Sequence, residues 1–248
     1  MKPLRGIGDF YAMALDTLVQ IPRRPFAWRE FLSQCWFIAR VSIVPALLLA
    51  FPFTMLGAFI LNVLLLDVGA GDAAGTAAGL SMAQLGPVVT VLVVAGAGAT
   101  AICADLGART IREELDALRV MGIDPIQSLV VPRVLAATVI AMLLSAITSL
   151  ATLVGSFVFT VFVQNVTPGA WAASLTVLTG LTDVVVIFLK AALFGMAAGL
   201  IGCFKGISVG GGPAGVGNAV NETVVYAFMA LFIINLFVTA GQFGGGGR

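Results

Sequence analysis

Charged side chains that could bind a partner concentrate in one stretch of the chain, residues 105–133, DLGARTIREELDALRVMGIDPIQSLVVPR. At about 100° per residue of helix, acidic and basic side chains share one stripe of this stretch and apolar ones share another. Such a stripe can form charge-assisted hydrogen bonds with a second protein. The alternative is a solvated helix whose charges only balance one another. The charged stripe consists of Asp105, Arg109, Arg112, Asp116 and Arg119, with Glu113 and Glu114 beside it.

Local signals mark the end of this charged helix and the start of the next. Gly122 is placed to end a helix, because glycine readily adopts the left-handed conformation found at helix termini. Asp124 can cap the following helix, Pro125 suits its first position, and Gln127 suits the third position of a capping box. The sequence therefore predicts that a charged helix stops near Gly122 and that an apolar helix begins at Pro125.

The residue types needed for catalysis or metal binding are absent or scattered. The chain has no His, the usual proton-transfer group and a common metal ligand. Cys35, Cys103 and Cys203 have no close spacing, which favours packing residues over a disulfide framework or a metal site. The stretch 206–217, GISVGGGPAGVG, lacks the Gly-Lys-Ser/Thr ending of a phosphate-binding loop. We expect no catalytic residue, metal or cofactor in this chain, and any ATP to be bound by a partner.

Composition assigns the chain to the membrane proteins. Of its 248 residues, 60% are hydrophobic and 10% are charged, against roughly 25% charged in a soluble domain. The mean hydropathy is +1.08. A net charge of +1 predicts no nucleic-acid partner. We expect an all-α integral membrane protein with about five transmembrane helices, at roughly 41–66, 83–104, 134–163, 184–204 and 223–241.

Two of these spans have features of their own. The first contains Pro45, Pro52 and Asn62, so we expect it to be kinked or partly broken. The third would be on the order of 45 Å long at about 1.5 Å per residue, so it must tilt or project from the roughly 30 Å hydrocarbon core.

The distribution of Lys and Arg predicts the orientation. Eleven basic residues precede the first span or flank the links after spans two and four, whereas the links 67–82 and 164–182 contain none. The positive-inside rule then places the N-terminus and the 105–133 stretch in the cytosol and the C-terminus outside. The eleven are Lys2, Arg5, Arg23, Arg24, Arg29, Arg40, Arg109, Arg112, Arg119, Arg133 and Lys205.

An amphipathic helix is expected before the first span. Its apolar residues fall within about 80° on a helical wheel and its polar ones lie opposite, as in a helix lying in the headgroup plane. The alternative is an arm docked on another subunit. The apolar residues are Leu4, Ile7, Tyr11, Leu15 and Leu18. We divide the chain into this helix with a basic linker (1–30), the membrane domain (31–241) and a Gly-rich tail (242–248).

Span four contains two small-residue pairs and one charged residue inside the apolar run. Gly195-x-x-x-Gly199 and Gly202-x-x-x-Gly206 favour close helix contact within the bundle. Lys190 is seven residues from Asp183 on the same face. We interpret it as a lysine that reaches toward the membrane surface and pairs with Asp183, rather than a transported-ion site.

Two segments carry a resemblance to a known family. The first is Glu113-x-x-Asp116-Ala117-Leu118-x-x-Met121-Gly122-x-Asp124-Pro125, followed by Leu129-Val130 and Pro132-Arg133, and the second is Gly211-Gly212-Pro213, Gly215-Val216 and Thr223-Val224-Val225. They resemble the signatures of the MlaE/YrbE family, the permease subunits of Mla and mammalian-cell-entry (Mce) ABC lipid transporters. The match is colinear from about residue 25 to 241. Pro213-Ala214 stands where many members have Ala-Glu, so no role for that carboxylate is carried over.

This resemblance implies a mechanism. Two permeases would form the membrane core of a transporter in a bacterial plasma (inner) membrane, with the 105–124 helix seated as a coupling helix on a cytosolic ABC ATPase dimer that binds ATP and Mg. A hexamer of Mce-domain proteins would stand outside the membrane. The Gly212-Pro213 form resembles the actinobacterial Mce-associated branch, in which two different permeases are paired.

The resemblance also implies an apolar cavity for a lipid at the permease interface. The final span contributes candidates for its wall, although that face could instead pack wholly inside one subunit. They are Phe228, Phe232 and Leu236. The rivals from other classes are a secondary transporter or channel needing no ATPase, which usually keeps ionisable groups at the membrane midplane, and a scaffold without transport activity.

Overall fold

The computed structural model describes residues 2–23, 26–70, 73–178 and 180–244. Arg24, Asp72 and residues 245–248 of the expected tail lie outside these ranges, as do the side chains of Lys2, Leu4 and Arg5. The described residues form helices and short links, with no strand among them. In chain order the elements are α1 (Lys2–Gln20), α2 (Trp28–Asp67), α3 (Ala74–Val93), the π-helical η2 (Val94–Ala99), α4 (Thr100–Ile111), α5 (Glu114–Val120), the π-helical η3 (Ile126–Val130), α6 (Val131–Phe162), α7 (Pro168–Leu178), α8 (Leu181–Ile207) and α9 (Gly212–Gly244).

Five helical runs are long and apolar enough to cross a bilayer, which confirms the all-α fold with five spans. Two of them are composite, because α3, η2 and α4 form one run and η3 continues into α6. Most runs extend beyond the apolar segments seen in the sequence, since a helix can continue into polar flanks that hydropathy does not report. The runs are Trp28–Asp67, Ala74–Ile111, Ile126–Phe162, Leu181–Ile207 and Gly212–Gln242.

The first span, α2, is helical throughout although it contains Pro45 and Pro52. The partial break considered from the sequence is therefore not present. Asn62, a polar residue expected to weaken the span, is buried, and its Nδ2 donates a hydrogen bond to Thr160 Oγ1 of α6 at 3.0 Å. Because α2 lies along α6 and α3, these neighbours support it where a proline removes a backbone hydrogen bond.

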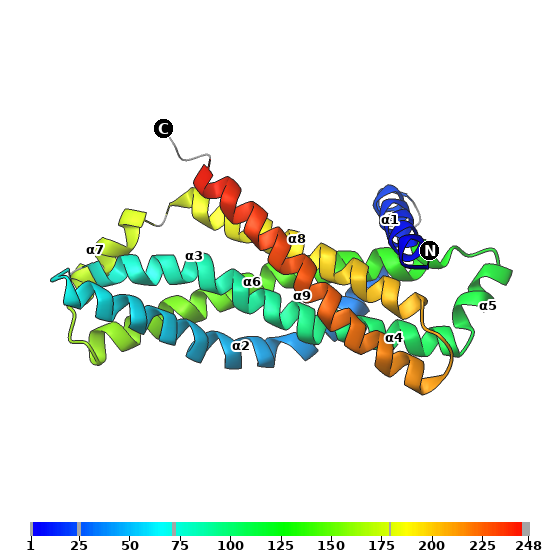
Figure 1. The fold of residues 1–248 in the computed structure, drawn as a ribbon, viewed down its shortest axis with the longest axis horizontal. Coiled ribbons are helices and arrows are strands. Elements are labelled where there is room, and N and C mark those ends of the chain that lie inside the picture. Colours follow the sequence, from blue (N-terminus) through cyan, green and yellow to red (C-terminus); the bar gives the residue numbers. More distant parts are fainter. Residues whose placement is uncertain (1, 24–25, 71–72, 179, 245–248) are drawn as a thin grey trace.

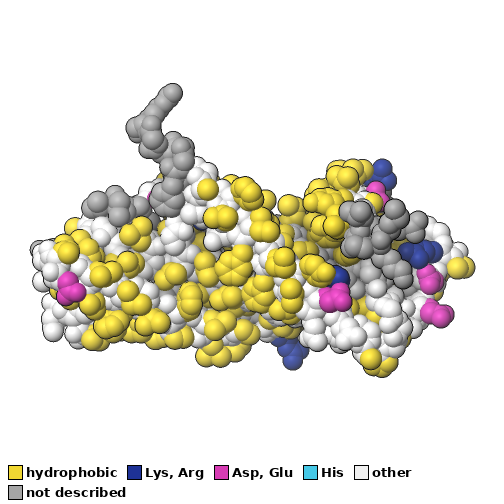
Figure 2. Space-filling model, in the orientation of Figure 1, with side chains coloured by type: hydrophobic (Ala, Val, Ile, Leu, Met, Phe, Trp, Pro, Cys, Tyr) yellow, Lys and Arg dark blue, Asp and Glu magenta, His cyan; other side chains and the backbone are white. Residues whose placement is uncertain are grey.

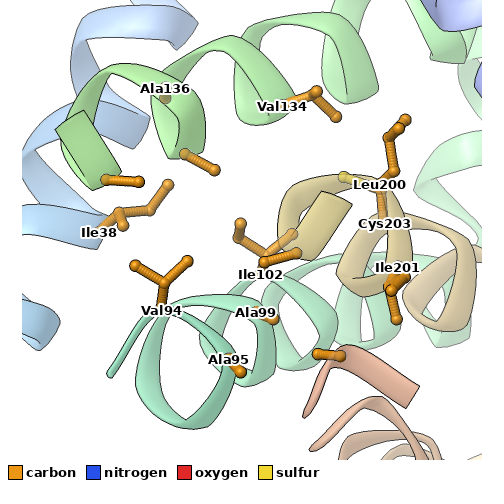
Figure 3. Packing of buried hydrophobic residues seen from close by; sticks show 14 of the residues in the cluster. Ile38, Val94, Ala95, Ala99, Ile102, Val134, Ala136, Leu200, Ile201 and Cys203 are labelled. Carbon is orange, nitrogen blue, oxygen red and sulfur yellow. The ribbon is translucent and has the colours of Figure 1, made fainter. Parts of the chain in front are cut away.

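Small residues let the helices approach closely at the centre of the bundle. A Cβ atom added at Gly195 would lie 2.5 Å from Ala137 O of α6, and one added at Gly202 would lie 2.6 Å from Ala99 O of η2. Both small-residue pairs of α8 therefore make contacts within the bundle, as predicted. Figure 3 shows buried side chains that converge there from several helices, among them Ile38, Val94, Ile102, Val134 and Leu200.

Most of the charged side chains visible in Figure 2 lie at one end of the elongated bundle. This charged end is formed by α1, residues 105–125 and the α8–α9 link, whereas α7 and the α2–α3 link lie at the opposite end (Figure 1). Between the two ends the surface in Figure 2 is mainly apolar. Such a distribution suits a protein that crosses a membrane along its long axis.

Helix α1 lies across the bundle at the charged end and is seen nearly end-on in Figure 1. Its inner side packs on the bundle through the buried Met13 and Thr17, and the ring of Phe10 contacts that of Phe204 edge to face, with centroids 5.4 Å apart. The predicted apolar stripe lies on the side that remains exposed. Its described members are Ile7, Tyr11, Leu15 and Leu18.

Candidate functional site

The charged stretch is not one continuous helix. It is divided into the end of α4, which finishes at Ile111, and the short α5, which begins at Glu114. Between them Glu113 has φ 60°, a left-handed conformation that is uncommon for a residue other than glycine. The expectation of a single helix was wrong here, because helical periodicity does not report a turn made without Gly or Pro. We call residues 105–124 the docking segment.

Helix α5 has the two faces that the sequence predicted. Leu115 is buried and Leu118 packs against the core, so the apolar face holds the helix on the bundle. On its other face Arg119 Nη1 lies 2.9 Å from Asp116 Oδ1, and both side chains are more than half exposed. Exposed pairs of this kind contribute little to stability. These charges are therefore free to exchange their partners for those of another protein.

The turn between the two helices has a similar exposed pair. Arg112 Nε lies 2.9 Å from Glu114 Oε1, and Arg112 and Glu113 are both exposed. Arg109 lies deeper, with its Nε 3.4 Å from Asp105 Oδ1. Of the seven charged residues predicted to bind a partner, those from Arg112 onward are thus grouped at the tip of the docking segment.

Asp105 differs from the other six, because it faces the interior and contacts Arg133. Arg133 lies in the first turn of α6 and its side chain is 0% exposed. Its Nη2 lies 2.5 Å from Asp105 Oδ2 of α4 and 3.0 Å from Glu30 Oε1 of α2, and its Nη1 donates to Leu129 O at 2.9 Å. We call Arg133, Asp105 and Glu30 the buried ion cluster.

Sequence reasoning missed the buried ion cluster as a site. Arg133 was used to predict orientation and as part of the family resemblance, and Glu30 was not singled out. The signal available was an Arg placed at the start of an apolar span, where a buried charge requires partners. Nothing in the spacing identified those partners, because Glu30 lies 103 positions away from Arg133 in the chain.

The predicted helix end and cap are present. Gly122 has φ 74°, its N–H donates to Arg119 O at 3.0 Å, and the Ile123 N–H donates to Leu118 O at 2.9 Å, a pattern that closes α5. Asp124 Oδ1 accepts from the Ile126 N–H at 2.9 Å, and Pro125 precedes η3. The other carboxylate oxygen of Asp124 accepts from Gln20 Nε2 at 2.9 Å, which connects the docking segment to α1.

The three candidates on the final span differ in burial. Phe228 is half-buried against the core, whereas Phe232 is 50% exposed and Leu236 is 67% exposed. This face does not pack wholly inside the subunit. Exposed apolar side chains also run along α2, including Trp36, Leu48 and Phe51. Helices α9 and α2 thus each present an apolar surface that can contact hydrocarbon or a second membrane protein.

We expected Lys190 to pair with Asp183, and this expectation was wrong. Its side chain is buried and its Nζ donates to Thr239 Oγ1 of α9 at 2.9 Å. Asp183 instead accepts from Gln242 Nε2 at 2.8 Å and from the Gly180 N–H at 2.9 Å. Thr239 and Asp183 therefore both join α8 to α9, and Asp183 also accepts from the backbone at the start of α8.

A half-open hollow of about 250 Å³ lies between α3, α6 and α8. Its wall is apolar apart from Ser149, so it could hold part of a hydrocarbon chain and offers little to a polar ligand. Among the described residues no group of His, Cys, Asp or Glu could hold a metal ion, and Cys103 and Cys203 are buried packing residues. The lining residues are Met82, Ala146, Ser149, Leu150, Leu153, Val184, Ile187 and Phe188.

Known proteins resemble this chain over most of its length. The family model "Permease MlaE" matches residues 31–240. A probable ABC transporter permease protein of Synechocystis sp. is 34% identical over 180 residues, which cover 72% of this chain and 68% of that protein. The intermembrane phospholipid transport system permease protein MlaE of Haemophilus influenzae is 30% identical over 186 residues, 74% of this chain and 71% of that protein. A probable ABC transporter permease protein of Rickettsia bellii is 28% identical over 236 residues, 95% and 91% of the two chains.

Proposed function

Because the chain belongs to the MlaE permease family, we propose that it is the membrane-spanning permease subunit of an ABC transporter that moves lipids across the cell envelope. The family match carries this proposal, together with the names of the relatives as an ABC transporter permease and a phospholipid transport permease. The chain itself is non-catalytic, and ATP and Mg are bound by a partner ATPase. The multi-pass bundle belongs in the bacterial plasma (inner) membrane.

The docking segment is where the ATPase binds. Its tip projects from the charged end of the bundle, as α5 does in Figure 1, and its exposed ion pairs can exchange partners without loss of a buried contact. We orient this end toward the cytosol, with the N-terminus inside and the C-terminus outside. The exposed apolar stripe of α1 then lies in the headgroup layer of the same membrane surface. Residues 31–241 form the permease domain, between an N-terminal part (1–30) and a tail (242–248).

The exposed surfaces of α2 and α9 face a second permease and the lipid. A lipid needs an apolar wall rather than an ordered set of polar ligands, and Phe232 and Leu236 offer such a wall. Because Gly212-Pro213 at the start of α9 resembles the actinobacterial Mce-associated branch, we propose that the second permease is a different chain. A hexamer of Mce-domain proteins would receive or supply the lipid outside the membrane.

Charge reversal in the docking segment tests the function. The double variant Glu113→Lys and Asp116→Lys should recover less ATPase on copurification and lose lipid-stimulated ATP hydrolysis, while inserting normally. Lys and Glu tolerate the left-handed φ of residue 113 about equally, so the backbone of the turn is not altered.

The matched control reverses two exposed acids of α1, Asp9→Lys and Asp16→Lys, at the same end of the bundle. It should copurify with the ATPase as the unaltered chain does. Unchanged ATPase recovery and transport in the docking-segment variant would refute docking at this segment. A wild-type chain that transports lipid without any ATPase would instead support a secondary transporter.

A further inference from the structure

We propose that the buried ion cluster is a positioning element that transmits movement of the docking segment to the first span, α2. The inference rests on the proposed function, because it requires an ATPase that displaces α4 and α5. Arg133 is the positioning residue, and Asp105 and Glu30 are the two groups through which it holds α4 and α2.

The contacts form a continuous path between the docking segment and α2. Asp105 lies six residues before Ile111, the end of α4, which is about 9 Å along a rigid helix. Arg133 joins it to Glu30, which is in the first turn of α2. The Glu30 carboxylate is held in place, since its Oε1 also accepts from Gln34 Nε2 at 3.0 Å. A displacement of α4 therefore reaches the start of α2 through two ion pairs.

Burial of Arg133 makes these two pairs hard to separate. The guanidinium is 0% exposed, whereas the side chains of Glu30 and Asp105 are 26% and 28% exposed. If either helix moved away alone, Arg133 would lose one of its two carboxylate partners in a site that water does not reach. Helices α4 and α2 therefore move together, because their separation would break one of the two ion pairs.

The geometry of the guanidinium also provides for a second arrangement. Both carboxylates contact Nη2, while Arg133 Nε is buried and has no acceptor among the described residues. A buried donor without an acceptor is unfavourable. A small rotation of α4 or shift of α2 could bring one carboxylate onto Nε and Nη2 side by side, the bidentate geometry that Arg favours. The cluster can therefore exchange between two discrete arrangements, as a transmitting element requires.

Helix α2 is suited to receive the movement. Large apolar side chains are exposed along most of its length, so only part of its surface is fixed by the bundle. The same exposed surface is the one proposed to face the second permease and the lipid. A shift at its start would change that surface along the whole helix, because α2 is unbroken from Trp28 to Asp67.

The experiment follows α2 directly in the complex with the ATPase. Leu48, 69% exposed in the middle of α2, is replaced by Cys and labelled with an environment-sensitive fluorophore in a Cys35→Ala background. Cys103 and Cys203 are buried and remain in place. The signal change on adding ATP is then compared between the unaltered cluster and the variants Glu30→Gln and Asp105→Asn. We expect Glu30→Gln, which lies outside the docking segment, to recover ATPase within twofold, and we expect both variants to reduce the ATP-induced signal at least fivefold.

The control removes another inter-helix ion pair at the same end. Lys205 Nζ lies 2.6 Å from Glu222 Oε2, a pair that joins α8 and α9, and Glu222→Gln should keep the full signal. A full signal in both Glu30→Gln and Asp105→Asn would overturn the inference. So would an equal loss in the control, or a signal loss that only follows reduced ATPase recovery, which would indicate a purely structural role. If the wild-type chain recovers no ATPase, the proposed function fails and the inference fails with it.

Discussion

Replacing Gly195 by alanine tests how closely α8 and α6 approach. The added Cβ would lie 2.5 Å from Ala137 O and 2.7 Å from Thr138 Cα, whereas ordinary contacts begin at 3.4 Å. The helices must therefore separate locally by about 0.9 Å, the difference between 3.4 and 2.5 Å. Both nearest atoms belong to the backbone of α6, so no side chain can rotate away. Overpacking of this kind typically costs about 1–3 kcal/mol.

Substitution of a glycine on α9, Gly217, by alanine is the control that separates the packing cost at Gly195 from the change in helix propensity. A Cβ added at Gly217 would meet nothing within 4 Å, and its backbone is not in the left-handed region. Alanine favours a helix over glycine by about 1 kcal/mol at either position, so this contribution cancels when the two variants are compared. Gly217→Ala should be as stable as the wild type or more stable, and Gly195→Ala should be less stable than Gly217→Ala by about 1–3 kcal/mol.

The assay is reversible unfolding of the purified chain in detergent, followed by tryptophan fluorescence or circular dichroism. The free energy of unfolding is measured for the wild type and both variants under the same conditions. Equal stability of Gly195→Ala and Gly217→Ala would show that α8 and α6 do not approach closely enough to exclude a methyl group. The interpretation of the small-residue pair would then be wrong.

Three further outcomes are expected. Glu113→Gly should stabilise the turn between α4 and α5 by about 1 kcal/mol, since glycine adopts positive φ without strain; lower thermal stability would contradict the left-handed turn. A cysteine at Val68, exposed at the end opposite the charged end, should react with an impermeant maleimide on intact cells, and one at the exposed Ala214 should not; the reverse pattern would invert the orientation. Phe232→Gln should assemble normally yet lower lipid crosslinking and lipid-stimulated ATP hydrolysis, and an assembled complex with unchanged crosslinking would place the lipid elsewhere.

Residues near the link between α2 and α3 differ in how accessible they are to a labelling reagent. The sequence favours Gly75 as a labelling site, since it lies in the acidic link expected before span two. In the structure it is buried, and a Cβ there would lie against the Trp171 carbonyl oxygen and the Ser174 side chain of α7. Val68, which is 75% exposed, is the better probe of the same link.

The sequence by itself determined the features that depend on neighbouring residues and on transfer from water to lipid. Five apolar runs of sufficient length predicted the five spans, because about twenty consecutive apolar residues are needed for a helix to cross the hydrocarbon core. Gly122 and Asp124 predicted the end of α5 and the cap of the next helix, because a helix terminus is satisfied by groups within a few residues. The close contact at Gly195 could be predicted in kind, since small residues favour helix contact, although its partner could not.

Only the tertiary structure decided which distant side chains meet. Glu30, Asp105 and Arg133 come together because the rotations of α2, α4 and α6 about their own axes bring them to one point. The partner of Lys190 is Thr239 rather than Asp183 for the same reason, since the position of α9 beside α8 is set by packing. The turn at Glu113 likewise has no Gly or Pro to announce it. Hydropathy and periodicity fix which face of a helix is apolar, but the angle and depth at which two helices pack depend on atoms contributed by both.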